Sequence, residues 1–377
     1  MIKISAFKAI KQAKMESGEI REDLKSILEP NSLNSHPLMF YRNRFEDLMH
    51  DESLYVDNEP AIYVYEHTEG DKSSRGVWAI TEIDEKVLSK INEHEQTIAD
   101  HAEKIKLYKD CVGIEGEPII LTYPPQKQIN ELLDLVTNDH QPEIYQQGDV
   151  SHRLWKVKNT VLIKTFERAF DSIPKLYVAD GHHRLAASVT GQSKGAQLIS
   201  TVYFSTDQLI IKEFNRLIIP VEQIDTNQLL GLINHLFEVS IIPGNLPYRP
   251  VNVHQMGMCL NGIWYQLNLK TNHHHLQDEA DAVILQEHIL KVYFKIYDPG
   301  EDKRLQNFDP VKGWSQLLDA ITNTPHSIAF TLFPITAEQF IDYADEGVFL
   351  PPKSTWIEPK LPYGLMIYNS LLPDRCV

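Results

Sequence analysis

The residues best suited to chemistry lie in a polar turn between two apolar runs, in the segment 175–189. The first run has the composition of a strand, and the second has the pattern of a helix. A helix N-terminus offers unpaired N–H groups, a glycine allows close approach of a ligand, and an arginine can hold a phosphate with two N–H groups. We therefore expect this turn to bind an anion through Asp180, Gly181, His182, His183 and Arg184. The alternative is a capped turn, in which Asp180 is an N-cap and the histidines pack locally.

A second polar block, Glu93, His94 and Glu95, supplies two carboxylates and an imidazole. The stretch 84–109 around it has apolar residues at near-helical intervals, so we expect one exposed helix or two shorter ones there. A carboxylate of this block can take the proton of an acceptor hydroxyl, or hold Mg²⁺ against a transferring phosphate. A zinc-protease pair is excluded, because Ile98 stands where the second histidine would be. The alternative is a solvated helix face that carries charges.

Two further places offer cations and hydroxyls. Prolines frame a loop near the C-terminus, whose candidate phosphate ligands are Lys353, Ser354, Thr355 and Lys360. Such groups can neutralise charge that builds in a transition state, or the prolines only hold the C-terminal chain against the body. Arg216 interrupts an apolar run, and a buried arginine needs an acidic partner from the protein or from a ligand.

Other motifs are set aside. The cluster His273, His274 and His275 is expected in an exposed loop with side chains that point apart, so it does not predict a metal site. The segment 278–281 (Asp-Glu-Ala-Asp) imitates a helicase motif, but the sequence has no Gly-x-x-x-x-Gly-Lys-Ser/Thr loop. The absence of Gly-x-Gly-x-x-Gly and Gly-x-Ser-x-Gly patterns disfavours Rossmann oxidoreductases and α/β-hydrolases.

Composition limits the class of protein. The chain has 377 residues with 42% hydrophobic content, which is enough for a large core. Its three cysteines form no Cys-x-x-Cys pair, which fits a reducing compartment. A net charge of −16 argues against non-specific binding to nucleic acid, and no apolar run is long enough to span a bilayer. We therefore expect a cytoplasmic protein without nucleic-acid or membrane partners. An oligomer is compatible with the sequence.

The elements that must position these residues indicate an α/β (α+β) fold in three regions. These are an N-terminal α+β region over 1–116, a central α/β region with the polar turn over 117–243, and a smaller C-terminal α+β region over 244–377. The expected central strands are 118–123, 175–179, 199–204 and 209–211. The expected hairpins are 61–65 with 76–80 and one within 258–267, where Asn261-Gly262 is typical of a type I′ turn.

In order along the chain, several blocks resemble the signature blocks of the family of unknown function DUF1015. They are 93–97, 152–155, 178–184, 214–216, 281–286, and 352–355 followed by 358–360. The resemblance covers most of the chain. It departs near the N-terminus, where residues 29–31 read Glu-Pro-Asn in place of an Ala-Pro-Pro-Tyr-Asp-like segment. The family name implies no activity.

The turn at 180–184 also resembles, more loosely, the Gly-x-His-Arg or Gly-x-Arg-Arg loop of the ParB and sulfiredoxin superfamily, which binds nucleotide phosphates at a helix N-terminus. This resemblance implies a ParB/sulfiredoxin-like nucleotide-binding core with a mixed sheet. His182 stands where sulfiredoxin has its reactive cysteine, which disfavours sulfinic-acid repair. Because the acidic charge disfavours DNA partitioning, the branch that phosphorylates small molecules, such as the free serine kinases, is the nearest analogy.

The resemblance therefore implies a nucleotide-dependent phosphotransferase (kinase) that acts on a small hydroxylated metabolite such as free serine. The implied donor is ATP or ADP. Mg²⁺ is implied by the chemistry, since phosphoryl transfer needs a cation that bridges the phosphates, although no ligand set for it is legible. Glu95 or Glu93 is the expected base or metal ligand, with His94 beside them. The alternative is a non-catalytic sensor that binds a nucleotide or a phosphorylated metabolite.

Overall fold

The computed structural model describes the chain except residues 14–21, 29–35, 190–196, 222–223, 312 and 372–377, so the segment 29–31 lies outside the described residues. Internal contacts divide the chain into two units. Unit 1 is Met1–Leu209 with Pro359–Val377, and unit 2 is Ile210–Glu358. This division differs from the three regions expected from the sequence, because strands from 1–116 and from 117–209 pair in one sheet.

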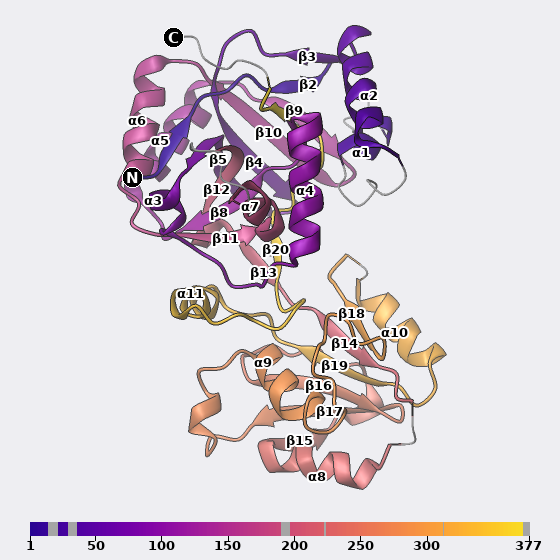
Figure 1. Cartoon of the computed structure of the whole chain (residues 1–377). Coiled ribbons are helices and arrows are strands. Elements are labelled where there is room, and N and C mark those ends of the chain that lie inside the picture. Colours follow the sequence, from indigo (N-terminus) through magenta and orange to yellow (C-terminus); the bar gives the residue numbers. More distant parts are fainter. Residues whose placement is uncertain (14–21, 29–35, 190–196, 222–223, 312, 372–377) are drawn as a thin grey trace. The chain divides into compact units, whose positions relative to one another are not determined.

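Among the described residues, a nine-stranded mixed sheet forms the centre of unit 1 (Figure 1). Its path is β6 (Ile91–Asn92), β11 (Leu176–Asp180), β8 (Ile119–Tyr123), β12 (Gln197–Ser205), β5 (Lys72–Ile83), β4 (Ile62–Glu69), β10 (Val150–Val157) and β9 (Glu143–Gln147), while β1 (Lys3–Ser5) pairs with β5. β6 is parallel to β11 and β8 is parallel to β12. The expected α/β fold with a mixed sheet is confirmed.

Two helices cover one face of this sheet, α5 (Lys127–Asp139) and α6 (Thr160–Asp171). Their apolar residues, among them Ile129 and Phe166, pack against sheet residues such as Val64 and Leu121. The side chain of Asn159 caps α6, because it accepts hydrogen bonds from the first backbone N–H groups of that helix. Burial of this face supplies the main apolar core of unit 1.

The expected hairpin at 61–80 is confirmed as β4 and β5, which pair in antiparallel register. Gly76 is required within it. A Cβ at this position would lie 2.4 Å from the carbonyl oxygen of Tyr203 on the neighbouring strand β12. The glycine therefore lets two central strands approach closely.

The stretch 84–109 is not the helix, or the two helices, that its periodicity predicts. It forms the short helix α3 (Glu85–Leu88), the strand β6, a loop over 93–98 and the helix α4 (Ala99–Val112). Asp84 caps α3 by accepting a hydrogen bond from the backbone N–H of Val87. The pairing of β6 with β11 is a tertiary contact, and it overrides the local helical pattern.

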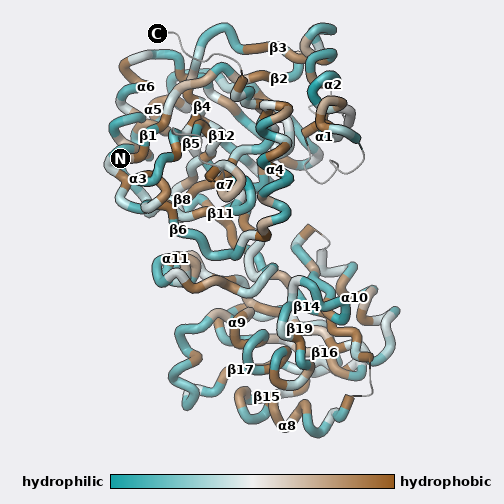
Figure 2. The backbone as a smooth tube through the Cα atoms, in the orientation of Figure 1, coloured by the Kyte–Doolittle hydropathy of each residue, from teal (hydrophilic) through white to brown (hydrophobic). Residues whose placement is uncertain are grey.

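The rest of unit 1 packs around α4. The helix α4 contacts α7 (His182–Val189) and α2 (Leu38–His50), which in turn contacts α1 (Glu22–Leu28). Two small sheets complete the unit, namely β2 (Ile10–Gln12) with β3 (Leu54–Val56) and β7 (Ile114–Glu115) with β21 (Tyr368–Asn369). Figure 2 shows hydrophobic residues along β4 and β12 and mostly hydrophilic residues along α4.

Unit 2 contains a six-stranded antiparallel sheet. Its order is β15 (Phe237–Ile241), β17 (Ile263–Leu269), β16 (Gln255–Leu260), β19 (Ile328–Leu332), β14 (Asn215–Ile218) and β18 (Leu305–Phe308). The helices are α8 (Thr226–Leu236), α9 (Asp281–Leu285) with a π-helical turn at Gln286–Leu290, α10 (Gly313–Asn323) and α11 (Ala337–Glu346). The strands β13 (Ile210–Lys212) and β20 (Trp356–Glu358) form a separate pair.

The expected hairpin within 258–267 is confirmed as β16 and β17. Asn261 and Gly262 form its turn with φ of 50° and 74°, the positive values that a type I′ turn requires. Among the described residues, no helix has the length and apolar character needed to cross a membrane.

Candidate functional site

Two polar segments leave the same edge of the unit 1 sheet. β6 and β11 are parallel, with Ile91 opposite Leu176 and Asn92 opposite Tyr177. Parallel strands end on the same side, so the loop 93–98 and the corner at 180–182 both begin there. The structure thus brings together the Glu93–Glu95 block and the turn at 180–184, which the sequence singled out separately.

Two pairs of imidazoles join these segments. The ring of His94 lies edge-on to that of His182, with 4.6 Å between the ring centroids. The ring of His183 lies 4.6 Å from that of His101 on α4, and His183 Nε2 accepts a hydrogen bond of 3.0 Å from the backbone N–H of Ile98. The loop 93–98 is therefore held against the first turn of α7.

The buried pair, His94 and His182, is held in the neutral form. Their side chains are 1% and 6% exposed. Burial lowers the pKa of His94 well below its ordinary value, and the neighbouring His182 lowers it further. Burial, together with His183 and Lys360, lowers the pKa of His182 to about 3. At neutral pH both rings are uncharged, so they supply no positive charge to an anion.

Gly181 makes the corner between β11 and α7. Its φ is +96°, in the left-handed region, and its carbonyl accepts the hydrogen bond of Leu185 N–H that starts the helix. A Cβ at this position would lie 2.8 Å from Nε of Arg184. The glycine therefore serves the backbone turn and also leaves room for the guanidinium to fold back over the corner.

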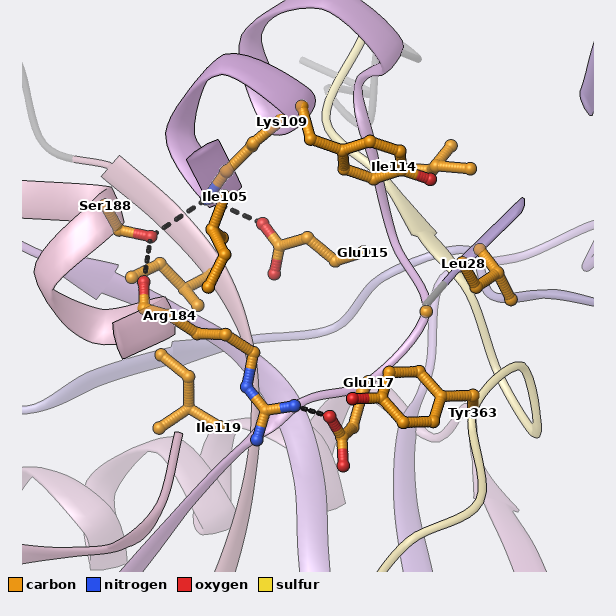
Figure 3. A pocket seen from close by; sticks show the side chains of 13 residues that line it. Leu28, Ile105, Lys109, Ile114, Glu115, Glu117, Ile119, Arg184, Ser188 and Tyr363 are labelled. Atoms are coloured by element: carbon orange, nitrogen blue, oxygen red, sulfur yellow. Dashed lines mark hydrogen bonds and ion pairs between the residues drawn. The ribbon is translucent and has the colours of Figure 1, made fainter. Parts of the chain in front are cut away.

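The carboxylate of Asp180 is held by two cations. Its Oδ2 accepts a hydrogen bond of 2.6 Å from Nη2 of Arg184, and its Oδ1 pairs with Nζ of Lys360. Arg184 also pairs with Glu117 through Nη1 (Figure 3). The guanidinium thus lies between two protein carboxylates. In this arrangement Arg184 positions Asp180, and both of its terminal nitrogens contact protein carboxylates. The sequence predicts instead that these nitrogens hold a phosphate.

The acidic block supplies two half-buried carboxylates, Glu93 and Glu95. Burial raises the pKa of Glu93. A raised pKa makes a carboxylate a better proton acceptor near neutral pH. Both groups lie in the loop before α4 rather than on an exposed helix face, which departs from the sequence-based expectation and from its alternative.

Four other candidate ligands belong to unit 2. Arg216 is 3% exposed, and its Nη2 donates to the backbone carbonyls of Pro352 and Lys353 at 3.2 and 2.7 Å. Burial lowers the pKa of Arg216 to about 10. Ser354 Oγ donates to the carbonyl of Pro351, which fixes the loop internally. Backbone carbonyls therefore occupy Nη2, and an acidic partner from the protein or from a ligand stays a prediction. The role of Arg216, Lys353, Ser354 and Thr355 in phosphate binding remains a prediction.

The side chains at the sheet edge decide whether the expected Mg²⁺ fits this site. The described residues contain no group of three or more His, Cys, Asp or Glu side chains that could hold a metal ion. Mg²⁺ usually takes one or two protein carboxylates and completes its shell with phosphates and water. Glu93 or Glu95 can supply such a carboxylate, so the residues fit a cation that enters with a phosphate ligand.

Sequence reasoning missed Glu117, His101 and Glu115. Glu117 precedes the apolar strand β8, and a single acidic residue in that place has no distinctive spacing. Glu115 pairs with Lys109 at 2.6 Å and accepts a hydrogen bond from Ser200 N–H. These contacts connect segments far apart in the sequence, so no local pattern could have shown them.

Comparisons with known proteins give a family match. The model of a family described as "Protein of unknown function (DUF1015)" matches residues 25–290. A search of the curated proteins finds no match.

Solved structures show low similarity. SbnI with a C-terminal truncation from Staphylococcus aureus has 13% identity, with 76% of this chain and 87% of that chain covered and a TM-score of 0.40. A conserved hypothetical protein from Pyrococcus furiosus has 14% identity, coverage of 76% and 93%, and a TM-score of 0.35. A free serine kinase in complex with AMP has 15% identity, coverage of 76% and 92%, and a TM-score of 0.38. TM-scores this low do not assign a function to this chain.

Proposed function

The chain belongs to the DUF1015 family, and from that premise we propose that it is a nucleotide-dependent phosphotransferase. The proposed donor is ATP or ADP, and the proposed acceptor is the hydroxyl of a small metabolite such as free serine. The observation that carries this proposal is the parallel pairing of β6 with β11, because it joins two half-buried carboxylates to a glycine corner at a helix N-terminus.

The phosphates of the donor would lie at the N-terminus of α7. The first N–H groups of a helix have no intrahelical partner, and the helix dipole favours negative charge there. Lys360 adds a cation beside Asp180. The neutral pair of His94 and His182 lies buried beside this corner.

The transfer itself needs a proton acceptor. The acceptor oxygen forms a bond to the terminal phosphorus, the bond from that phosphorus to the bridging oxygen breaks, and the shortened nucleotide leaves with the electron pair. The proton of the hydroxyl passes to Glu95 or Glu93. Mg²⁺, when bound, would neutralise charge on the phosphates. The raised pKa of Glu93 suits the role of base.

The test is turnover by the purified chain with ATP or ADP, Mg²⁺ and a pool of hydroxy amino acids, followed by phosphorus NMR. We expect a new phosphomonoester signal, and we expect Glu95→Gln or Glu93→Gln to lower its rate by about 100-fold or more. Glu103→Gln is the matched control, because Glu103 is exposed on α4. If wild-type protein forms no phosphomonoester with any donor and acceptor, the kinase proposal is wrong.

The second candidate, a non-catalytic sensor of a nucleotide or phosphometabolite, is favoured by one observation. Arg184 and Lys360 already pair with protein carboxylates, which is a stable resting arrangement for a binding site without turnover. In the same NMR assay a sensor gives no product, while calorimetry shows a saturable heat with the nucleotide.

A further inference from the structure

Four charged side chains form a row of ion pairs within unit 1. The carboxylate of Glu117 pairs with Nη1 of Arg184 (Figure 3). Nη2 of Arg184 donates to Oδ2 of Asp180 at 2.6 Å, and Oδ1 of Asp180 pairs with Nζ of Lys360. Two carboxylates and two cations thus alternate along the row, so it has no formal net charge.

The row runs from more buried to more exposed side chains. The exposed fraction of the side chain is 13% for Glu117, 17% for Arg184, 24% for Asp180 and 35% for Lys360. Solvent and salt screen a buried ion pair less than an exposed one, so the buried pair is held more firmly. Glu117 is therefore the fixed end of the row, and the ammonium of Lys360 is the end that a ligand can reach.

The backbone beside Glu117 is also held in place. The carbonyl of Gly116 accepts a hydrogen bond of 2.7 Å from the N–H of Gly364. Pro118 follows Glu117, and the ring of a proline restricts its φ. Gly364 lies in the same C-terminal segment as Lys360. The two ends of the row are therefore carried by segments that contact each other.

Glu117 determines how Arg184 shares its two terminal nitrogens. A guanidinium and a carboxylate often pair through two parallel hydrogen bonds. Here Nη1 goes to Glu117 and Nη2 goes to one oxygen of Asp180, so the other oxygen is available to Lys360. Without the carboxylate of Glu117, Nη1 would turn to Asp180 and compete with Lys360 for it.

Lys360 acts at the N-terminus of α7, where the proposed function places the phosphates of the donor. Burial lowers the pKa of His182, the first residue of that helix, and the charges of His183 and Lys360 lower it further. The ammonium therefore lies close enough to this helix end to act on a charge there. A displacement of Lys360 would remove one positive charge from the phosphate site.

We propose that Glu117 is a positioning residue of the phosphate site. It holds Arg184 so that Asp180 keeps one oxygen for Lys360, and it thereby places the ammonium beside the first turn of α7. Glu117 acts only through Arg184 and touches neither the nucleotide nor the acceptor. This inference rests on the proposed function for the presence of phosphates at that helix end.

The test is a double-mutant cycle on the full chain, with inorganic tripolyphosphate as the probe. Calorimetry measures its Kd for wild type, Glu117→Gln, Lys360→Met and the double variant. We expect each single substitution to weaken tripolyphosphate by about tenfold, because each removes the contact made by Lys360. The double variant should also be weakened by about tenfold, and not by the product of the two losses.

The matched control is Glu66→Gln. Glu66 is likewise a buried carboxylate of unit 1 that pairs with arginine side chains, those of Arg75 and Arg153, but it lies on β4, which β8, β12 and β5 separate from β11. Its substitution should leave the Kd of tripolyphosphate unchanged, so it reports the general effect of losing a buried ion pair.

A second variant covers the case in which Glu117→Gln does not give a cooperative thermal transition. Glu117→Asp keeps the charge but shortens the side chain. We expect it to weaken tripolyphosphate by less than Lys360→Met does, and to add no further loss when the two substitutions are combined.

The outcomes separate this proposal from the proposed function. If wild type binds tripolyphosphate and the two losses multiply, or if Glu117→Gln has no more effect than Glu66→Gln, the positioning role is wrong while the phosphate site stands. If the losses coincide but wild type shows no turnover, the positioning role stands and the kinase proposal fails. If wild type does not bind tripolyphosphate, the positioning role and the phosphate site are both wrong.

Discussion

Gly181 determines both the backbone conformation at the corner between β11 and α7 and the position of Arg184. Substitution by alanine would place a Cβ in a backbone conformation with φ of +96° and 2.8 Å from Nε of Arg184. We expect Gly181→Ala to lower the free energy of unfolding by about 1–3 kcal/mol, because the backbone is strained and Arg184 must move away from Asp180. Urea denaturation measures this change.

The control for this prediction is Gly148→Ala. Gly148 also has a positive φ, of +59°, but a Cβ there would meet nothing within 4 Å. It therefore reports the cost of the backbone conformation alone. Equal losses in the two variants would show that the contact with Arg184 is unimportant.

At the same scale, the sequence predicted which residues gather at the site better than what each one does. Asp180, Gly181, His182 and His183 do meet Glu93 and His94 at one sheet edge. The role of Arg184 was not predictable, because its partner Glu117 lies in another segment with no motif of its own. The backbone carbonyls that Arg216 contacts were likewise not predictable, because they lie in the distant segment 352–353.

At the scale of elements, the contact between the loop 93–98 and α7 should give unfolding a specific pH dependence. The folded-state pKa of His182 is about 3, below the ordinary value of 6.5. Above pH 6.5 the imidazole is neutral in both the folded and the unfolded state, so it does not change the free energy of unfolding. As pH falls below 6.5 the unfolded state takes up the proton first, so stability is lost, by about 1.4 kcal/mol per pH unit.

Removal of that imidazole should flatten the acid side of the profile. We expect His182→Gln to lose less stability than wild type between pH 6.5 and pH 4.5, whatever its stability at pH 7.5. Urea denaturation at several pH values gives the two slopes. Identical slopes would mean that His182 is not buried in the neutral form.

The sequence predicts the long buried strands of unit 1 well, but it does not predict the short strand β6. The expected strands at 118–123, 175–179 and 199–204 are β8, β11 and β12. The strand β6 has two residues, and no periodicity can be read from two residues. The helical periodicity of 84–109 therefore predicts a helix at the Glu93 block, where the chain forms a strand and a loop. The structure shows instead that a short parallel pairing with β11 brings this block to the site.

At the scale of the whole molecule, the sequence did not predict that the C-terminal segment returns to unit 1. The polar loop expected over 350–360 is divided, because Lys353, Ser354 and Thr355 belong to unit 2 and Lys360 belongs to unit 1. Composition and spacing are continuous across this boundary. The contact of Lys360 with Asp180 and the pairing of β21 with β7 show that the C-terminal segment belongs to unit 1.

The two units have separate cores, which leads to a prediction about folding. Two apolar clusters lie wholly within unit 1 and two lie wholly within unit 2. We expect a chain that joins Leu209 to Pro359 through a Gly-Gly linker, without Ile210–Glu358, to unfold cooperatively. Calorimetry checks this expectation, and a chain without a thermal transition would contradict it. Binding of tripolyphosphate by the shortened chain would further assign the phosphate site to unit 1.

The pairing of β13 with β20 makes such a chain possible. Ile210 lies opposite Glu358 in this pair, so the outgoing and the returning chain are neighbours, about 5 Å apart. Unit 2 is therefore an insertion in unit 1, which has an apolar core of its own, and the chain enters and leaves unit 2 at this strand pair. Because the two ends of the insertion are neighbours, an insertion of different length can begin and end there without a change in unit 1. Variation in length among homologues should therefore concentrate between Ile210 and Glu358. The number of residues between β6 and α7 should stay constant.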